Sequence, residues 1–282
     1  MKRIATAVIL ILLVCILIFL GKPWMLMLVA ALFAGLAAYE YVKLAEAQGY
    51  RIPLWWIFPA IALLFLVILN TSVPRDVMLP MLSGLGLLLL TWAALRQPLD
   101  RVLPDAAAGI FALFYIAYPL TLLPLMRAMW DGAALLLFLL VAVWAGDIAA
   151  LYIGKNFGKR KLAPRLSPNK TWAGSIASIG GSVLAALGVV LLGDYLATKD
   201  ILVLHISEPL WQTLLLAAIV NIAAQLGDLL ESAIKRGAGV KDSGTLLPGH
   251  GGILDRIDAL LVAAPVLWYC LLIKDYFGWG QF

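Results

Sequence analysis

Long apolar stretches separated by short polar segments run along the whole chain. Each approaches the roughly 20 apolar residues that an α-helix needs to cross a hydrocarbon core. Lipid offers the backbone no hydrogen-bond partners, so helices are the element expected of such runs. The pattern therefore predicts an all-α fold, a polytopic integral membrane helix bundle with about nine transmembrane helices. The expected spans are residues 4–21, 24–43, 54–70, 77–95, 105–126, 132–153, 173–192, 211–234 and 256–274.

Turn-forming and charged residues interrupt the apolar runs, most clearly at residues 21–23, 71–75 and 96–98. The first run follows Lys2 and Arg3, as a secretory signal would. Its apolar stretch is longer than a usual signal core, and no clear small-residue cleavage site follows it. We therefore expect it to be the first span.

Composition agrees with a membrane protein, because 63% of the residues are hydrophobic and only 13% are charged. Soluble domains carry about 25% charged residues. If the N-terminus is cytoplasmic, few of the 21 lysines and arginines lie on the outer side of the membrane, as the positive-inside rule predicts. The net charge of +5 is therefore explained mostly by membrane topology. We therefore expect no nucleic-acid partner and an inner (cytoplasmic) membrane location. The cations then left outside are Lys22, Arg75, Arg127, Lys199 and Lys274.

The orientation places two polar loops, residues 154–172 and 235–255, on the cytoplasmic side. Nucleotides and metal ions are available there. We therefore expect residues 1–130 to form N-terminal membrane-spanning helices and residues 131–282 to form the catalytic, membrane-embedded region.

Charged residues gather in residues 228–258, although ionised groups at bilayer depth are costly unless they pair or serve a function. Asp228, Glu231, Ser232 and Lys235 have offsets of three, four and seven residues, which place them on one helix face. Such a face can hold a cation and an anion side by side. The alternative is a Glu231–Lys235 pair that closes a helix end, with Asp228 solvated.

A glycine-rich segment follows this helix, and glycines let the backbone approach phosphate closely. Asp255 and Asp258 lie three residues apart at the next helix start, where they could simply cap the helix. Capping alone would not require Arg256 beside them. Mg²⁺ commonly takes one or two carboxylates plus substrate phosphates, and we expect Asp228 and Asp255 to supply them. His250 also lies among these charges, although a lone histidine is often structural.

The other cytoplasmic loop superficially resembles a phosphate-binding loop. Only three residues separate Gly154 from Gly158, and Arg160 follows Lys159, so the P-loop motif is absent. Four polar residues still precede the seventh span, where a helix N-terminus favours phosphate. An interfacial anchor explains the loop equally well. The four residues are Ser167, Asn169, Lys170 and Thr171.

Asp147 is a lone acid deep in an apolar run and is a candidate site residue. It could support a metal site, or it could be a carboxyl group that is hydrogen-bonded across helices. Cys15 and Cys270 fall inside predicted spans and suggest neither a disulfide nor a metal site. His205 falls in a predicted outer loop, where we expect no chemical role.

Residues 232–258 resemble the signature of the phosphatidate cytidylyltransferases, the CDP-diacylglycerol synthases, and the similarity continues upstream through residues 161–172. A string of 27 positions with fixed spacing is far more specific than a short motif. The departures lie upstream. Residues 147–151 read Asp-Ile-Ala-Ala-Leu where the family often has Asp-Ser/Thr-Gly-Ala-Tyr, Ala173 replaces a common glutamate and Asn169 replaces a usual glycine.

The resemblance implies that a phosphatidate oxygen attacks the α-phosphorus of CTP, which gives CDP-diacylglycerol and pyrophosphate. It implies Mg²⁺ as cofactor, with a possible second monovalent or divalent cation. Lys161 is expected to matter far less than the metal carboxylates. The implied catalytic residues are Asp228, Asp255, Lys235, Arg236, Lys241, Asp242, His250, Arg256 and Asp258. The implied substrate-binding residues are Ser167, Asn169, Lys170, Thr171, Glu231, Ser232 and Asp147.

Two other functions fit parts of the same pattern. A related enzyme could use CTP on another lipid, such as a polyprenol or an ether lipid. A transporter or flippase could also place acids and lysines near a substrate path. The expected partners are CTP, phosphatidate and the lipid bilayer, and a homodimer is possible.

Overall fold

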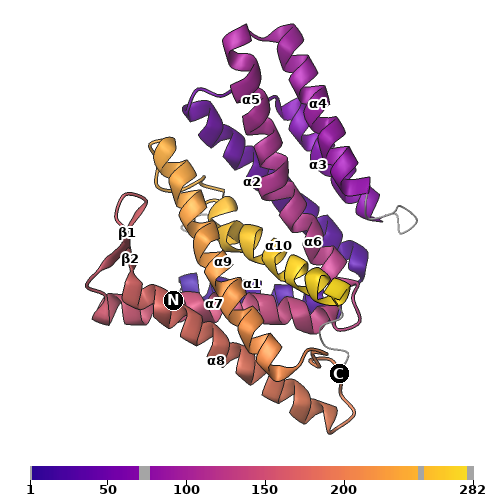
Figure 1. Cartoon of the computed structure of the whole chain (residues 1–282), viewed down its shortest axis with the longest axis vertical. Helices are drawn as coiled ribbons and strands as arrows, with labels where there is room; N and C mark the ends of the chain where they lie inside the picture. The colour runs from indigo at the N-terminus through magenta and orange to yellow at the C-terminus, as the bar shows by residue number, and fades with distance from the viewer. Residues whose placement is uncertain (1, 70–76, 247–250, 278–282) are drawn as a thin grey trace. The chain divides into compact units, whose positions relative to one another are not determined.

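The computed structural model describes residues 2–69, 77–246 and 251–277, without the side chains of residues 2–10 and 275. Helices dominate it (Figure 1). The elements are α1 (Lys2–Phe19), α2 (Pro23–Ala47), α3 (Leu54–Leu69), α4 (Met78–Arg96), α5 (Leu99–Ala112), η2 (Leu113–Ala117), α6 (Tyr118–Arg127), α7 (Gly132–Phe157), β1 (Lys161–Ala163), β2 (Ser167–Thr171), α8 (Trp172–Ala197), α9 (Leu210–Gly237) and α10 (Leu254–Phe277).

The predicted all-α membrane architecture is confirmed. Within the described residues, seven helices are long and apolar enough to cross a membrane. One of them is the continuous run Leu99–Arg127, in which η2 is a short π-helical segment between α5 and α6. Helix α3 is apolar but shorter. The count of nine spans therefore stays a prediction.

The chain forms two compact units. The first comprises Met1–Pro23, Leu125–Ser232 and Asp258–Phe282, and the second comprises Trp24–Pro124 and Ala233–Ile257. Each unit draws on segments from before and after residue 130. The expected division into N-terminal membrane-spanning helices (residues 1–130) and a catalytic region (residues 131–282) stays a prediction.

In the first unit, α7 and α8 pack closely near the hairpin that joins them and diverge toward their other ends (Figure 1). Small residues let their backbones approach, as is usual between helices in membranes. A Cβ atom on Gly181 would lie 2.6 Å from the Ala149 side chain, and one on Gly174 would lie 3.0 Å from the Ala150 carbonyl oxygen. The close packing places the polar groups of both helices within reach of one another.

A short β-hairpin joins α7 to α8, where the sequence predicted only a polar loop. Strands β1 and β2 pair antiparallel, with Lys161 opposite Thr171 and Ala163 opposite Ser167. The Trp172 N–H donates to the Arg160 carbonyl at 3.0 Å, and Thr171 Oγ1 accepts from the Gly174 N–H at 3.2 Å. These bonds fix the hairpin to the first turn of α8.

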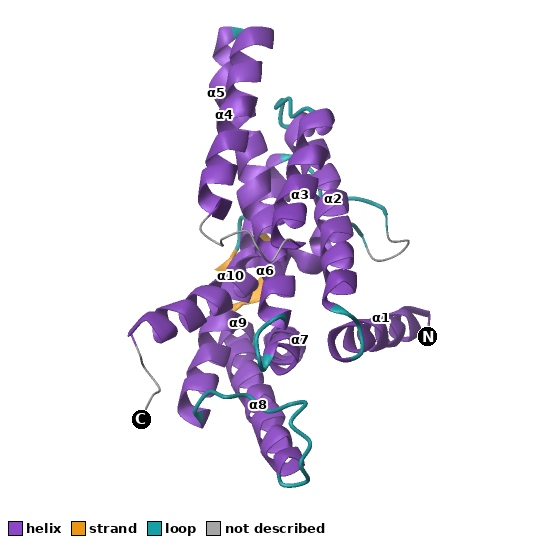
Figure 2. Ribbon diagram, turned by 90° about the vertical axis from the view of Figure 1, so that its right-hand side faces the viewer, coloured by secondary structure: helices purple, strands orange, loops and turns teal. Residues whose placement is uncertain are grey.

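In the second unit, α4 and α5 form an antiparallel pair, which is seen side by side in Figure 1 and overlapping in Figure 2. Helix α2 carries a buried apolar face that includes Ala34, Ala37 and Ala38. The same helix buries one carboxylate, that of Glu40. Because an ionised group is costly to bury, this carboxylate requires hydrogen-bond donors around it.

Candidate active site

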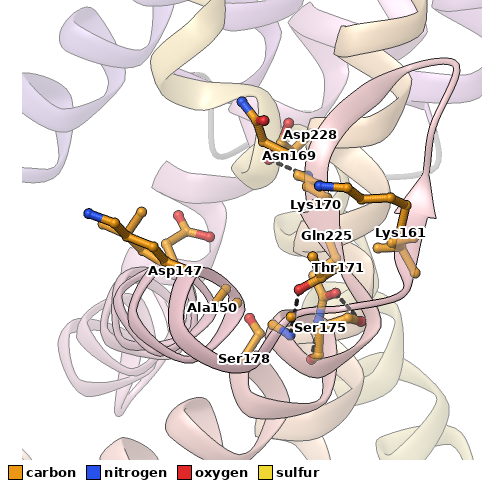
Figure 3. Close-up of a pocket in the computed structure, with 16 residues that line it drawn as sticks. Asp147, Ala150, Lys161, Asn169, Lys170, Thr171, Ser175, Ser178, Gln225 and Asp228 are labelled. Atoms are coloured by element: carbon orange, nitrogen blue, oxygen red, sulfur yellow. Dashed lines mark hydrogen bonds and ion pairs between the residues drawn. The ribbon is translucent and has the colours of Figure 1, made fainter.

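A pocket of about 700 Å³ with several charged and polar side chains in its wall opens in the first unit (Figure 3). Its walls come from α7, the hairpin, the start of α8 and the middle of α9. Cationic and acidic side chains face the same space. The charged and polar lining residues are Asp147, Lys155, Lys161, Asn169, Lys170, Thr171, Ser175, Ser178, Gln225 and Asp228.

Lys170 and Asp228 form an ion pair at the pocket wall between Lys170 Nζ and Asp228 Oδ2. The Ser232 hydroxyl donates to the other carboxylate oxygen at 3.4 Å, as their spacing of four residues on α9 predicts. Asp147 reaches the pocket from α7 and lies within electrostatic range of both Lys170 and Asp228 (Figure 3). Two acids and a lysine that were singled out from the sequence thus converge.

The floor of the pocket is a chain of hydrogen bonds between α8 and α9. Ser175 Oγ donates to Gln225 Oε1 at 2.5 Å, and Gln225 Nε2 donates to Asn221 Oδ1 at 2.7 Å. Asn221 Nδ2 donates to the hydroxyl oxygens of Ser178 and Ser182, at 3.0 and 2.7 Å. The Ser182 hydroxyl in turn donates to a carbonyl oxygen of α7. Each member orients the next, so the amide of Gln225 has a defined direction at the pocket.

Gly146 makes this chain possible. A Cβ atom there would lie 2.7 Å from Ser182 Oγ and 2.8 Å from Ser178 Oγ, and still closer to Asn221 Nδ2. Real Cβ atoms do not approach polar atoms so closely. Only glycine at this position lets α7 close over the serines and Asn221.

In the second unit, Asp255 is surrounded by donors. Lys235 Nζ lies 2.6 Å from Asp255 Oδ1, and both side chains are largely buried. The backbone N–H groups of Ser243 and Gly252 donate to Asp255 Oδ2 at 3.0 and 2.8 Å. The pairing ties the end of α9 to the start of α10. Arg236 donates to the Val240 carbonyl at 2.9 Å and so helps to hold the turn after α9.

The predicted site residues are distributed over both units. Five of them line the pocket, namely Asp147, Asn169, Lys170, Thr171 and Asp228. Ser167 begins β2 outside the pocket wall, Glu231 and Ser232 are buried on α9, and Asp258 accepts from the Ala259 N–H. Lys241, Asp242 and Arg256 are exposed in the second unit. His250 lies outside the described residues.

Several residues that line the pocket were not predicted from the sequence. Lys161 was expected to matter little, yet it lines the pocket from β1, as Lys155 does from α7. Ser175, Ser178 and Gln225 were missed altogether. The available signal was the spacing of Ser175, Ser178 and Ser182 by three and four residues, and of Asn221 and Gln225 by four, within otherwise apolar helices.

The donors in the pocket fit Mg²⁺. Asp147 and Asp228 supply hard carboxylate oxygens, and Mg²⁺ typically takes one or two of these while substrate phosphates and water complete its shell. The described residues contain no cluster of three or more His, Cys, Asp or Glu side chains, so a caged metal site is absent from that part of the chain. Asp255 also offers a carboxylate, but its oxygens accept from Lys235, Ser243 and Gly252.

Comparison with known proteins agrees with the family resemblance of residues 232–258. The model of the cytidylyltransferase family matches residues 1–274. A phosphatidate cytidylyltransferase of Mycobacterium leprae is 32% identical over 93% of this chain and 83% of the relative. One of Staphylococcus haemolyticus is 32% identical over 94% of this chain and 96% of the relative.

A phosphatidate cytidylyltransferase of Brucella suis biovar 1 is 44% identical over 163 residues, which is 57% of this chain. The match covers 55% of that relative, so the chain spans about half the length of this relative. The family match, in contrast, runs through nearly the whole sequence. The chain belongs to the cytidylyltransferase family.

Proposed function

We propose that this protein transfers the cytidylyl group of CTP to phosphatidate. A phosphate oxygen of phosphatidate attacks the α-phosphorus of CTP, the bond from that phosphorus to the bridging oxygen breaks, and pyrophosphate leaves. CDP-diacylglycerol then stays in the membrane. The observation that carries the proposal is one pocket in which three lysines face two carboxylates, within apolar helices of a chain of this family.

The charges of the pocket suit this reaction. Both substrates are anions, so bringing them together requires charge neutralisation and alignment rather than a protein nucleophile. Lys155, Lys161 and Lys170 supply positive charge from α7, β1 and β2. We assign them to the triphosphate, and Lys170, already paired with Asp228, to the α-phosphate.

The floor of the pocket has a second role in the proposal. Gln225 and Ser175 are fixed by the hydrogen-bond chain and therefore present oriented polar groups. We assign them to an uncharged part of a substrate, the cytidine or the glycerol backbone. Oriented groups discriminate between ligands because a mismatched ligand leaves a buried polar atom without a partner.

We propose that Asp228 and Asp147 hold Mg²⁺ in this pocket. Bound Mg²⁺ would neutralise phosphate charge and polarise the phosphorus–oxygen bonds. Asp228 then has two partners of opposite charge, and Lys170 keeps its carboxylate oriented. Asp255, the other carboxylate expected from the sequence, stays a predicted ligand. The remaining predicted residues, including Lys241, Asp242, His250 and Arg256, stay candidates for the phosphate contacts of the glycine-rich segment.

The proposed location is the inner membrane, with the pocket open to the cytoplasm. Lysines and arginines concentrate in the segments that this orientation places inside. CTP is available on that side, while the acyl chains of phosphatidate remain among the apolar helices. The lipid would therefore enter laterally.

The direct test is pyrophosphate release by the purified protein in lipid nanodiscs. We expect release that requires CTP, Mg²⁺ and phosphatidate together, with radiolabelled cytidine recovered in the lipid phase. Omission of phosphatidate controls for simple CTP hydrolysis. A polyprenyl phosphate or an ether-linked phosphatidate as sole acceptor separates the related transferases. Absence of pyrophosphate with every lipid would contradict the proposal and favour a transporter.

A further inference from the structure

Glu40 lies near the end of α2, in the second unit, and only 2% of its surface is exposed. Three donors surround its carboxylate. The Ile253 N–H donates to Oε1 at 3.0 Å, while the Leu254 N–H and the Ser243 hydroxyl donate to Oε2, each at 2.9 Å. A buried carboxylate with such partners is firmly held.

The donors come from the other end of the sequence. Ser243 is 203 residues away from Glu40, and Leu254 is 214 residues away. Ser243 and residues 251–254 belong to the glycine-rich segment that carries the family signature. Glu40 therefore ties that segment to a helix of the N-terminal half.

Two glycines of the segment leave room for this carboxylate. A Cβ atom on Gly244 would lie 2.5 Å from Glu40 Oε1, and one on Gly252 would lie closer still to Oε2. Both positions require glycine because the carboxylate occupies the space of a side chain. Glycines that the sequence interpretation assigned to phosphate binding thus also accommodate Glu40.

The same segment also holds Asp255. The N–H groups of Ser243 and Gly252 donate to Asp255, which pairs with Lys235. The backbone donors at residues 252, 253 and 254 are consequently directed at protein carboxylates. The N–H groups of residues 252–254 therefore fix the positions of the Glu40 and Asp255 side chains.

We propose that Glu40 is a positioning residue of the cytidylyl transfer. Its carboxylate holds Ser243, Ile253 and Leu254 in place, and this arrangement sets the position of the Asp255–Lys235 pair. The inference rests on the proposed function. Glu40 itself touches no substrate, because its carboxylate is buried among the groups it binds.

The test compares Glu40→Gln with Glu46→Gln in the nanodisc assay. Glutamine has one carboxamide oxygen, so either orientation sets its NH₂ group against a backbone N–H of residue 253 or 254. We expect kcat/KM to fall about 10- to 100-fold, because small misplacements of catalytic groups cost that much. Glu46 lies on the same helix and forms an exposed ion pair with Lys43, so its variant should stay within about twofold.

A second variant, Ser243→Ala, removes one of the three donors and keeps both backbone bonds. We expect a smaller loss, and no additional loss when it is combined with Glu40→Gln, because residues that act through one contact are non-additive. Rates are normalised to protein that elutes as a single species. If Glu40→Gln fails to fold, normal activity of Ser243→Ala overturns the proposal.

A readout independent of activity is the thiol labelling of Ile253→Cys in a chain with Cys15 and Cys270 replaced by alanine. Residue 253 is buried, and Glu40→Gln should raise its labelling rate about tenfold or more by releasing the segment. Unchanged labelling, or kcat/KM of Glu40→Gln within about twofold of wild type, overturns the proposal. If the wild-type protein is inactive but Glu40→Gln still raises the labelling of Ile253→Cys, the proposed function alone is rejected.

Discussion

At the scale of single residues, the pocket depends on pairs of opposite charge brought together from different elements. Asp228 on α9 meets Lys170 on β2, and Asp147 on α7 faces both. Each acid is placed in an apolar helix, where an unpaired charge would be costly.

Asp228→Asn should reduce kcat/KM at least about 100-fold, since it removes the proposed metal ligand and the partner of Lys170. Asp194→Asn is the matched control, because Asp194 is exposed near the end of α8 and lies outside the pocket wall. The measurement is cytidine incorporation into lipid at several Mg²⁺ concentrations. Near-normal turnover of the Asp228 variant would remove the metal assignment.

The hairpin allows a comparison between neighbouring lysines. Lys161 and Lys159 are both exposed, but Lys161 lines the pocket and Lys159 does not. Lys161→Ala should raise the KM for CTP about fivefold or more, by the loss of one charge-assisted phosphate contact. Lys159→Ala should leave the KM within about twofold. Equal effects of the two substitutions would show that the hairpin acts only through its overall charge.

At the scale of elements, the pocket is built by the close packing of α7 on α8 and by side-chain hydrogen bonds from α8 to α9. The helices approach through Gly146, Gly174 and Gly181, and the polar side chains bond across the interfaces that result. An apolar run predicts a helix, but its register against a neighbour depends on the shapes of facing residues. The polar chain through Asn221 then fixes that register.

Gly146→Ala should destabilise the protein by about 1–3 kcal/mol, because the new methyl group overlaps Asn221 and two serine hydroxyls. Gly180→Ala on α8 is the matched control, since a Cβ atom there meets nothing within 4 Å. The thermal unfolding of both variants is measured by fluorescence-detection size-exclusion chromatography. A Gly146 variant as stable as the Gly180 variant would show that the interface is looser than the structure indicates.

At the scale of the whole molecule, the distribution of lysine and arginine predicts the orientation in the membrane. The exposed residues Lys241 and Asp242 fall in a segment predicted to be cytoplasmic. Nucleotide chemistry in a membrane protein depends on that orientation, because CTP does not cross the bilayer unaided. Orientation and function are therefore linked.

A single cysteine in place of Lys241, in a chain without Cys15 and Cys270, should be labelled in inverted vesicles and protected in right-side-out vesicles. CTP with Mg²⁺ should slow the labelling about threefold or more, by covering the exposed segment. Cysteine in place of Lys199 is the control, because Lys199 is predicted to face the opposite side. Labelling of residue 241 from outside only would contradict the orientation.

Much of the protein follows from its sequence alone. Hydropathy determined the helical membrane architecture, because lipid leaves the backbone no other way to satisfy its hydrogen bonds. The signature string and the lone acids pointed to the family and to Asp147, Lys170 and Asp228. Such signals are local, in that residues a few positions apart on one helix share a face whatever the rest of the chain does.

Tertiary structure alone decided which distant groups meet. Glu40 contacts a segment more than 200 residues away, and Lys161 reaches the pocket because a hairpin forms where the sequence showed only a polar loop. Ser175 and Gln225 become a pocket floor only when α8 packs on α9. Periodicity and spacing carry no information on such pairings, because packing geometry between helices selects them after the helices have formed.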